Sequence, residues 1–440
     1  MTDINKIYSE LTIIGTGMAG MAAAYFASKN KIETTQIGIN SGIIYSSGFF
    51  DLMGVHPIED RKTWENPWQA IDKLVSDIPD HPYARLGRSN IESAMDQFME
   101  FMNEAERPYM VRKNQNTKVI TPVGTVKSTY GVPRSMWAGA VALKEKHPCL
   151  IVDFWGLKAF SAKQITDMLM PRWPGIRPLR ISFPAVGPSS DLYPEQMARS
   201  LEIEANRIQL AEAIRPDLGD AAALGLPAIL GIYKPRQVRE HLEELLGVDI
   251  FEIPTIPPSL PGLRLKEAIE AKITGRGVRL LSQKRVLSAA QNTDGTFELS
   301  IGDRATSEIQ QIIGCNAVIL AGGRFLGMGL HAGRKKIREP LFDLPVFQPE
   351  DRALWHQTNF FDPRGHQISQ AGLEIDDSFR PTDLAGKPVY DNLFAAGSIL
   401  AHQDWMRQKC GAGLSIATAY GAVKAFKKLN IEHPTSNIEF

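Results

Sequence analysis

The chain is poor in cysteine, with only Cys149, Cys315 and Cys410 among its 440 residues. No two of them have the spacing of a metal-binding or redox motif. We therefore expect no metal site, and no iron–sulfur cluster held by a local cysteine motif. An odd and sparse set of cysteines also favours a reducing compartment.

The sequence also lacks net charge. Lysine plus arginine and aspartate plus glutamate each number 49, so the formal net charge is zero. Without an excess of one sign, no long-range field attracts nucleic acid or anionic lipid. We expect no nucleic-acid partner.

Long apolar runs are missing as well. A membrane-spanning helix needs roughly 20 apolar residues, whereas the longest apolar stretches here, such as residues 317–321 and 393–396, have the length of buried strands. Residues 1–6 show neither the basic segment nor the apolar core of a signal peptide. We expect a cytoplasmic protein that reaches the inner face of the membrane only through a partner.

What is present is the pattern of a nucleotide-binding unit. Residues 11–14 are a short β-branched run that ends at glycine, residues 18–28 are rich in alanine and predict a helix, and residues 34–39 predict a second strand. A strand, a helix and a strand within about 30 residues make one βαβ unit. This pattern predicts an α/β fold with a Rossmann-like FAD/NAD(P)-binding domain on a parallel sheet.

The composition changes near residue 60, where segments rich in Trp, Pro and Met begin. Residues 194–213 predict one long helix that starts with proline, and residues 234–246 predict another. We interpret residues 60–255 as an inserted α+β substrate or interface domain. The nucleotide-binding domain, for which we expect a flavin as ligand from the segments described below, is then discontinuous, at 1–59 and 256–440.

The sheet pattern returns after the insertion. The elements expected there are a helix at 265–274, strands at 279–281, 285–289, 297–301, 317–321 and 393–396, and a helix at about 414–428.

Three glycines directly after the first strand fit the dinucleotide fingerprint. Gly15 allows a tight turn, Gly17 lets the main chain approach a phosphate, and Gly20 lets the helix pack against the strand. Met18 and Ala19 open the helix, whose first N–H groups and partial positive charge suit a phosphate. A GxGxxG sequence alone is weak, but between a strand and a helix it is specific.

The second strand departs from the usual pattern. A dinucleotide fold usually ends this strand with Asp or Glu, which holds the ribose hydroxyls, but here the residue is Asn40. An amide binds ribose without the charge-assisted strength of a carboxylate. Either the adenosine half is held less firmly, or the nucleotide lacks one, or Asn40 merely starts a turn before Ser41.

Further segments have the order of a flavin domain along the chain. They resemble those of flavoenzymes of the fumarate reductase and glutathione reductase groups, in which small residues let the main chain approach the flavin. The residues that we expect at the flavin in these segments are Ser46, Ser47, Gly48, Val286, Ala321, Gly322, Gly323, Gly397, Ser398, Gly411, Ala412, Gly413 and Leu414. The helix that starts near Leu414 would stabilise negative charge on the reduced ring.

A combination of short motifs resembles one family across nearly the whole chain, the B-subunit family of anaerobic glycerol-3-phosphate dehydrogenase. The motifs are Ser46-Ser47-Gly48 with Asp51-Leu52, His81-Pro82-Tyr83, Ile120-Thr121-Pro122, Pro257-Pro258-Ser259 with Pro261-Gly262 and Arg264-Leu265, Gly329-Leu330, Arg338-Glu339-Pro340, Arg380-Pro381, Asn392-Leu393-Phe394, and Cys410-Gly411 with Gly413.

The resemblance implies a complex of this flavin subunit with a catalytic FAD subunit and an iron–sulfur subunit that docks at the membrane. Glycerol 3-phosphate would be oxidised to dihydroxyacetone phosphate, and electrons would pass to quinone. The family is described as using FMN, whereas the glycine fingerprint favours FAD, so the flavin stays open. A self-contained FAD-dependent oxidoreductase for another small anionic substrate, and a structural subunit without flavin, are the alternatives.

Catalytic residues do not follow from the resemblance. On chemistry alone, Arg264, Arg324 and Arg380 could bind a phosphate or carboxylate in bidentate fashion. His402, close to Asp404, could carry a proton. A surface salt bridge for each arginine and a structural role for His402 are the competing interpretations.

Overall fold

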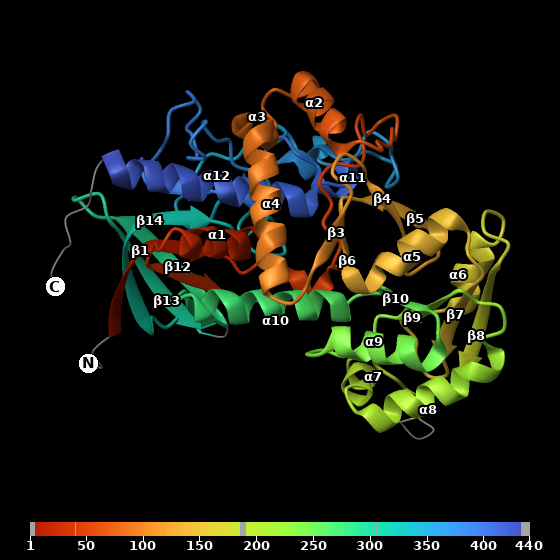
Figure 1. The fold of residues 1–440 in the computed structure, drawn as a ribbon. Coiled ribbons are helices and arrows are strands. Elements are labelled where there is room, and N and C mark those ends of the chain that lie inside the picture. The colour runs from red at the N-terminus through yellow and green to blue at the C-terminus, as the bar shows by residue number, and fades with distance from the viewer. Residues whose placement is uncertain (1–4, 40, 185–190, 304–305, 433–440) are drawn as a thin grey trace. The chain divides into compact units, whose positions relative to one another are not determined.

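The computed structural model describes residues 5–39, 41–184, 191–303 and 306–432 (Figure 1). The chain forms two compact units. The first comprises Met1–Gly42, Asp51–Phe101 and Ile269–Phe440, and the second comprises Ile43–Phe50 and Met102–Ala268. Residues 60–101, expected in the insertion, belong to the first unit.

The first unit is built on a seven-stranded sheet with the order β11-β2-β1-β14-β13-β12, in which β17 also pairs with β14. Its strands are β1 (Asn5–Ile14), β2 (Thr34–Gly38), β11 (Arg279–Ser282), β12 (Lys284–Gln291), β13 (Phe297–Asp303), β14 (Gln311–Leu320) and β17 (Leu393–Ala395). The pairs β1–β2, β1–β14, β2–β11 and β14–β17 are parallel. The expected Rossmann-like parallel sheet is confirmed.

Strand β14 has two different neighbours along one side. Its first half pairs with β13 in antiparallel fashion, from Gln311 opposite Ile301 to Cys315 opposite Phe297. Its last residues pair in parallel with β17, beginning with Val318 opposite Leu393. Parallel strands end at a common edge, so the segments after β1, β2, β14 and β17 meet there.

Two helices rich in small residues lie side by side against this sheet (Figure 1). They are α1 (Met18–Lys29) and α12 (Gly411–Glu432). Alanine and glycine allow this close packing, and Ala22, Ala23 and Ala24 of α1 are fully buried. The remaining elements of this unit are α2 (Pro67–Asp77), α3 (Pro82–Leu86), α4 (Arg88–Glu104), α11 (Trp405–Gln408), β15 (His331–Ala332), β16 (Ile337–Arg338), η3 (Arg352–Leu354), η4 (Gln367–Gln370) and η5 (Gly397–Ile399).

The second unit contains a four-stranded sheet of order β10-β9-β7-β8, parallel throughout. Its strands are β7 (Cys149–Phe154), β8 (Ile176–Ile181), β9 (Ala223–Pro227) and β10 (Asp249–Ile253). Two short antiparallel pairs accompany it, β3 (Tyr109–Val111) with β6 (Gly131–Pro133) and β4 (Thr117–Ile120) with β5 (Val126–Thr129). The helical elements are η1 (Gly42–Tyr45), α5 (Arg134–Glu145), α6 (Ala162–Leu169), α7 (Pro194–Leu201), α8 (Glu204–Ile214), η2 (Arg215–Asp217), α9 (Pro235–Leu246) and α10 (Leu260–Gly275), whose last residues belong to the first unit. The larger sheet of the expected α+β insertion is thus of the parallel α/β kind.

The single helix predicted at residues 194–213 is wrong, because α7 ends at Leu201 and α8 begins at Glu204. At the break, the Glu202 carboxylate accepts the N–H groups of Ile232 and Tyr233 at 2.9 and 2.6 Å. A long-range contact therefore sets this helix end.

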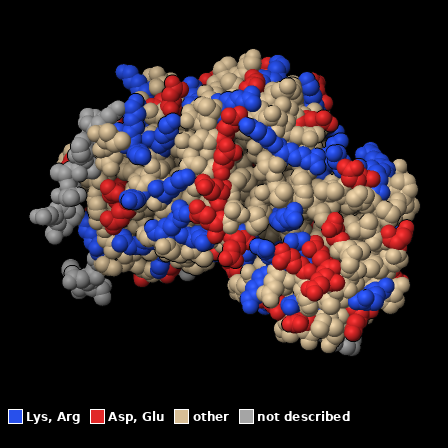
Figure 2. Space-filling model, viewed as in Figure 1, with Lys and Arg blue, Asp and Glu red and all other residues tan. Residues whose placement is uncertain are grey.

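On the face drawn in Figure 2, basic and acidic side chains lie interspersed, as expected for a chain of zero net charge.

Candidate functional site

The loop between β1 and α1 forms a tight glycine turn at the carboxyl edge of the first sheet. Gly15 has φ +127°, and a Cβ on it would overlap the carbonyl oxygen of Ala321. A Cβ on Gly20 would overlap the carbonyl oxygen of Gly15. The Gly15 N–H donates to Ile37 O at 2.7 Å, and Gln36 Nε2 donates to Gly15 O at 2.9 Å. Close packing of main chain therefore requires glycine at positions 15 and 20.

Gly17 differs from both. Among the described residues, no heavy atom beyond its chain neighbours lies within 4 Å of where its Cβ would stand. Gly17 is the N-cap of α1, no side chain caps this end, and the first turn holds no acidic residue. Open space in front of uncapped helix N–H groups is what a phosphate needs. The turn therefore fits the diphosphate of a flavin nucleotide.

The turn after β14 lies next to this loop. Ala321 N–H donates to Ile14 O at 2.8 Å. Gly323 has φ +69°, and its Cβ would stand 3.4 Å from Ser398 Oγ. The structure thus brings the predicted segment of residues 321–323 together with Ser398.

The segment after β17 completes the same edge. Gly397 has φ +81°, and its N–H donates to Thr418 Oγ1 on α12 at 2.8 Å. A Cβ on Gly397 would press against the Cβ of Ala19 on α1. Segments from opposite ends of the chain therefore meet here, as the flavin interpretation requires.

The start of α12 is packed against buried polar groups. The Gly413 N–H donates to Asp51 O at 2.8 Å, and a Cβ on Gly413 would stand 2.7 Å from the Tyr83 hydroxyl. That hydroxyl donates to Leu52 O at 2.8 Å, and burial raises the pKa of Tyr83. The Gly413 N–H is thus occupied by protein, while Gly411 and Ala412 begin the helix at this edge.

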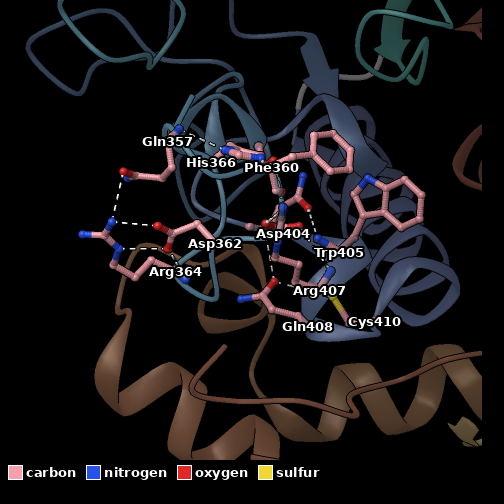
Figure 3. Close-up of polar contacts among 12 residues, drawn as sticks. Gln357, Phe360, Asp362, Arg364, His366, Asp404, Trp405, Arg407, Gln408 and Cys410 are labelled. Carbon is pink, nitrogen blue, oxygen red and sulfur yellow. Dashed lines mark hydrogen bonds and ion pairs between the residues drawn. The ribbon is translucent and has the colours of Figure 1, made fainter. Parts of the chain in front are cut away.

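Figure 3 shows the polar contacts around α11, just before α12. Asp404 caps α11 and forms an ion pair with Arg407 at 2.9 Å. Its N–H donates to Gln408 Oε1 at 2.9 Å, and Cys410 Sγ lies 3.8 Å from the same oxygen. Burial raises the pKa of the Cys410 thiol, so this cysteine is protonated and structural.

The loop of residues 357–366 lies beside α11 in the same view (Figure 3). His366 closes it, because its Nδ1 accepts the Gln357 N–H at 3.1 Å and its Nε2 lies 3.1 Å from Phe360 O. Arg364 and Asp362 form an ion pair at 2.8 Å within it. These groups satisfy one another and stiffen the loop.

The other predicted flavin contacts belong to other segments of the chain. In the second unit, Ser46 Oγ is buried without a hydrogen-bond partner among the described residues, which leaves it available to a ligand. The Tyr109 hydroxyl donates to Gly48 O at 2.6 Å, and Ser47 stands between these two positions. Val286 lies on β12 opposite Ile301. Asn40 lies outside the described residues.

Two of the candidate arginines are paired within the protein. Arg264 is buried and donates to both oxygens of Glu252, at 2.6 and 2.9 Å. Arg380 forms ion pairs with Asp376 at 2.8 Å and Asp391 at 3.1 Å. Neither guanidinium is free to bind an anion. Both form salt bridges, but that of Arg264 is buried and not at the surface, as the competing interpretation expected.

Arg324 is held differently. It donates to two main-chain carbonyls, those of Ser369 and Gln403, the second at 2.8 Å. Burial lowers the pKa of Arg324 to about 10, and the Asp404 carboxylate opposes that shift. The side chain therefore stays positively charged at neutral pH.

His402 lines a cavity of about 310 Å³ in the first unit, and its Nε2 lies 3.0 Å from Glu374 Oε1. The same cavity is lined by Arg85 and by three further carboxylates, those of Asp80, Asp376 and Asp377. An excess of acid groups repels an anionic substrate. His402 thus lies beside a carboxylate, in surroundings unsuited to a phosphate ester.

His81 has a structural place. It is fully buried, and its Nδ1 accepts the Tyr83 N–H at 3.2 Å as the N-cap of α3. Burial lowers its pKa to about 3, so the imidazole is neutral. His81 and Pro82 thus begin α3, which is a structural role.

Neither a membrane-spanning helix nor a metal-binding cluster occurs among the described residues. No helix there combines the length and apolarity that crossing a membrane requires. Across the same part of the chain, His, Cys, Asp and Glu do not gather into a group that could ligate a metal.

Several residues that support the site were not predicted from the sequence. Gln403 is fully buried and donates to Ser398 O and Leu400 O, and Thr418 receives the Gly397 N–H. Cβ atoms on Gly327 and Gly329 would overlap the carbonyl oxygens of Gly322 and Gly323. The repeated glycines at 322, 323, 327 and 329 were a usable signal, whereas Gln403 and Thr418 act through contacts that sequence spacing does not show.

Comparison with known proteins agrees with this geometry. A family model described as FAD binding domain matches residues 10–414. A probable B-subunit of anaerobic glycerol-3-phosphate dehydrogenase from Halobacterium salinarum is 30% identical over 431 residues, covering 94% of this chain and 97% of that relative. The corresponding B-subunit of Vibrio cholerae serotype O1 (strain M66-2) is 30% identical over 440 residues, covering 95% and 96%.

Among solved structures, the 3-ketosteroid delta1-dehydrogenase of Sterolibacterium denitrificans matches with a TM-score of 0.43 and 11% identity, covering 96% of this chain and 100% of that one.

The family match and the glycine turns together define a flavoprotein with an FAD-binding domain. The chain belongs to the B-subunit family of anaerobic glycerol-3-phosphate dehydrogenase and is a flavin-dependent dehydrogenase subunit. FMN, which the resemblance had implied, receives no support from these comparisons.

Proposed function

We propose that this chain binds FAD and serves as a flavin subunit of an anaerobic glycerol-3-phosphate dehydrogenase complex. In this role it takes part in oxidising glycerol 3-phosphate to dihydroxyacetone phosphate and passes electrons towards an iron–sulfur subunit and quinone. The observation that carries the proposal is the nearly full-length similarity to relatives named as B-subunits, joined to a glycine cradle at one sheet edge.

Different residues of the first unit would bind different parts of FAD. The N–H groups of α1 behind Gly17 would receive the diphosphate, because that helix end is open and uncapped. Gly322, Gly323, Gly397 and Ser398 line the same edge, where bulkier residues would block the approach of a ring or chain. The first residues of α12 would face negative charge on the pyrimidine end.

Bound FAD would supply hydride acceptance and release of single electrons. The protein contributes orientation and exclusion of water. Two of the three candidate arginines, Arg264 and Arg380, are paired with carboxylates and are not free to clamp a phosphate. This supports a role in which the substrate phosphate is bound chiefly by a partner subunit.

Identification of the flavin tests the first half of the proposal. Heat denaturation of the purified protein and chromatography of the supernatant should yield FAD, close to one per chain. Recovery of FMN would contradict the cofactor assignment, and a colourless protein would contradict the flavin role altogether.

Dye-linked assays test the second half. The isolated chain should oxidise glycerol 3-phosphate far more slowly than the complex purified with its partners. Equal rates would show that this chain is a self-contained oxidoreductase. Co-purification should recover a cysteine-rich partner, and a pure homo-oligomer would argue against the complex.

A further inference from the structure

Arg324 carries a charge that the cradle described above does not use. It follows Gly322 and Gly323 directly, and its guanidinium donates to the carbonyls of Ser369 and Gln403. Its Nε is buried without a hydrogen-bond partner among the described residues. Carbonyl groups offer only partial negative charge, so these contacts leave the positive charge of Arg324 uncancelled.

The surroundings place this charge near the start of α12. Gln403 is fully buried and also binds Ser398 O, so Arg324 braces the turn after β14 against the segment after β17. Asp404 is the next residue, and its carboxylate is already paired with Arg407 at 2.9 Å. Gln403 Oε1 accepts the Trp405 N–H at 3.0 Å, and Trp405 O accepts the N–H of Cys410, the residue before Gly411, which begins α12.

We propose that the partly buried cation of Arg324 sets the redox behaviour of the bound flavin by favouring negative charge on its ring, together with the N-terminus of α12. The inference rests on the proposed function, because it requires a flavin at this edge. A unit charge about 10 Å away in surroundings of effective dielectric constant about 20 changes an affinity by on the order of tenfold.

Sulfite provides the probe, because its addition to an oxidised flavin places negative charge on the ring and removes the visible absorbance. Sulfite should bind flavin-loaded Arg324→Gln on the order of tenfold more weakly than the wild type. Arg324→Lys keeps the charge, and its affinity should lie within about threefold of the wild type. Arg352→Gln is the matched control. Arg352 also donates to two main-chain carbonyls, those of Gly333 and Arg334, but it is exposed, and its loss should leave sulfite binding unchanged.

For Asp404→Asn we expect sulfite affinity to change in the opposite direction. This substitution removes the carboxylate beside Arg324 while keeping an oxygen that can cap α11, so sulfite affinity should rise. Where Arg324→Gln does not retain flavin, this variant still tests the sign of the charge effect at this place. Equal sulfite affinity in wild type and Arg324→Gln, or weaker binding in Asp404→Asn, would overturn the inference. Absence of flavin from the wild type would instead overturn the proposed function, so the two failures are distinguishable.

Discussion

Gly20 packs so closely on Gly15 that a Cβ on Gly20 would overlap the Gly15 carbonyl oxygen. Gly17, between them in the chain, has open space instead. The glycines therefore have two different structural roles, which the sequence motif alone does not distinguish. Positions 15 and 20 allow the turn to form, and position 17 leaves room for a ligand.

Substitution separates these roles. Gly20→Ala should destabilise the fold by about 1–3 kcal/mol, because the inserted methyl has no space. Gly17→Ala should change the free energy of unfolding by less than about 0.5 kcal/mol, since its φ of −75° suits any residue. The retained flavin should nevertheless fall in Gly17→Ala. Denaturant unfolding of the flavin-free proteins and flavin absorbance after gel filtration measure the two effects, and full flavin retention in Gly17→Ala would contradict the phosphate assignment.

Removal of the flavin should lower thermal stability. A ligand bound only by the folded state at about 100 times its Kd adds about 2.7 kcal/mol. Adding FAD back to the stripped protein should therefore raise Tm, and FMN at the same concentration should raise it less, since FMN lacks the adenosine half. Thermal scans with each flavin make the comparison. An equal or larger shift with FMN would contradict the FAD assignment.

Breaking the buried pair of Arg264 and Glu252 should destabilise the second unit. Arg264→Met leaves the Glu252 carboxylate buried without its cation, and such losses cost about 3–5 kcal/mol. Arg264 donates to Gly231 O, and Glu252 accepts the Leu230 N–H, so the pair holds the loop after β9. In the variant this loop should become accessible to protease. Limited proteolysis reports this loss. Arg236→Met, which breaks the exposed pair with Glu240, is the control and should leave the digestion pattern unchanged.

His81 should make stability depend on pH. Its pKa is about 3 when folded and 6.5 when unfolded, so below pH 6.5 the unfolded chain takes up a proton that the folded chain does not. Stability from this group is complete above pH 6.5 and falls as pH drops towards 3, by at most about 1.4 kcal/mol per pH unit.

His81→Asn keeps a side chain that can cap α3 but does not titrate. Its stability should vary less between pH 6 and pH 4 than that of the wild type, as measured by urea unfolding at several pH values. The exposed His331→Asn should keep the pH dependence of the wild type. Identical slopes for wild type and His81→Asn would contradict the assignment.

Local patterns predicted much of the first unit. The run at residues 11–14, the glycine turn and the alanine-rich helix are short-range features, and β1, α1 and β2 follow them closely. The predicted helix at 194–213 failed because Glu202 turns its carboxylate to main chain 30 residues away. The roles of Arg264 and Arg380 were likewise undecided, since their partners depend on the folded chain.

Strand β14 pairs with β13 over its first half and with β17 over its last residues, and this constrains the order in which the sheet forms. Its parallel partner β17 is separated from it by more than 70 residues, and α12, which completes the cradle, is the last helix described. Closing so long a loop is slow compared with forming the β13–β14 hairpin. A chain still emerging from the ribosome therefore lacks the surface against which a flavin would be held. We therefore expect flavin insertion to follow the synthesis of α12, and truncations that remove α12 should accumulate as flavin-free protein.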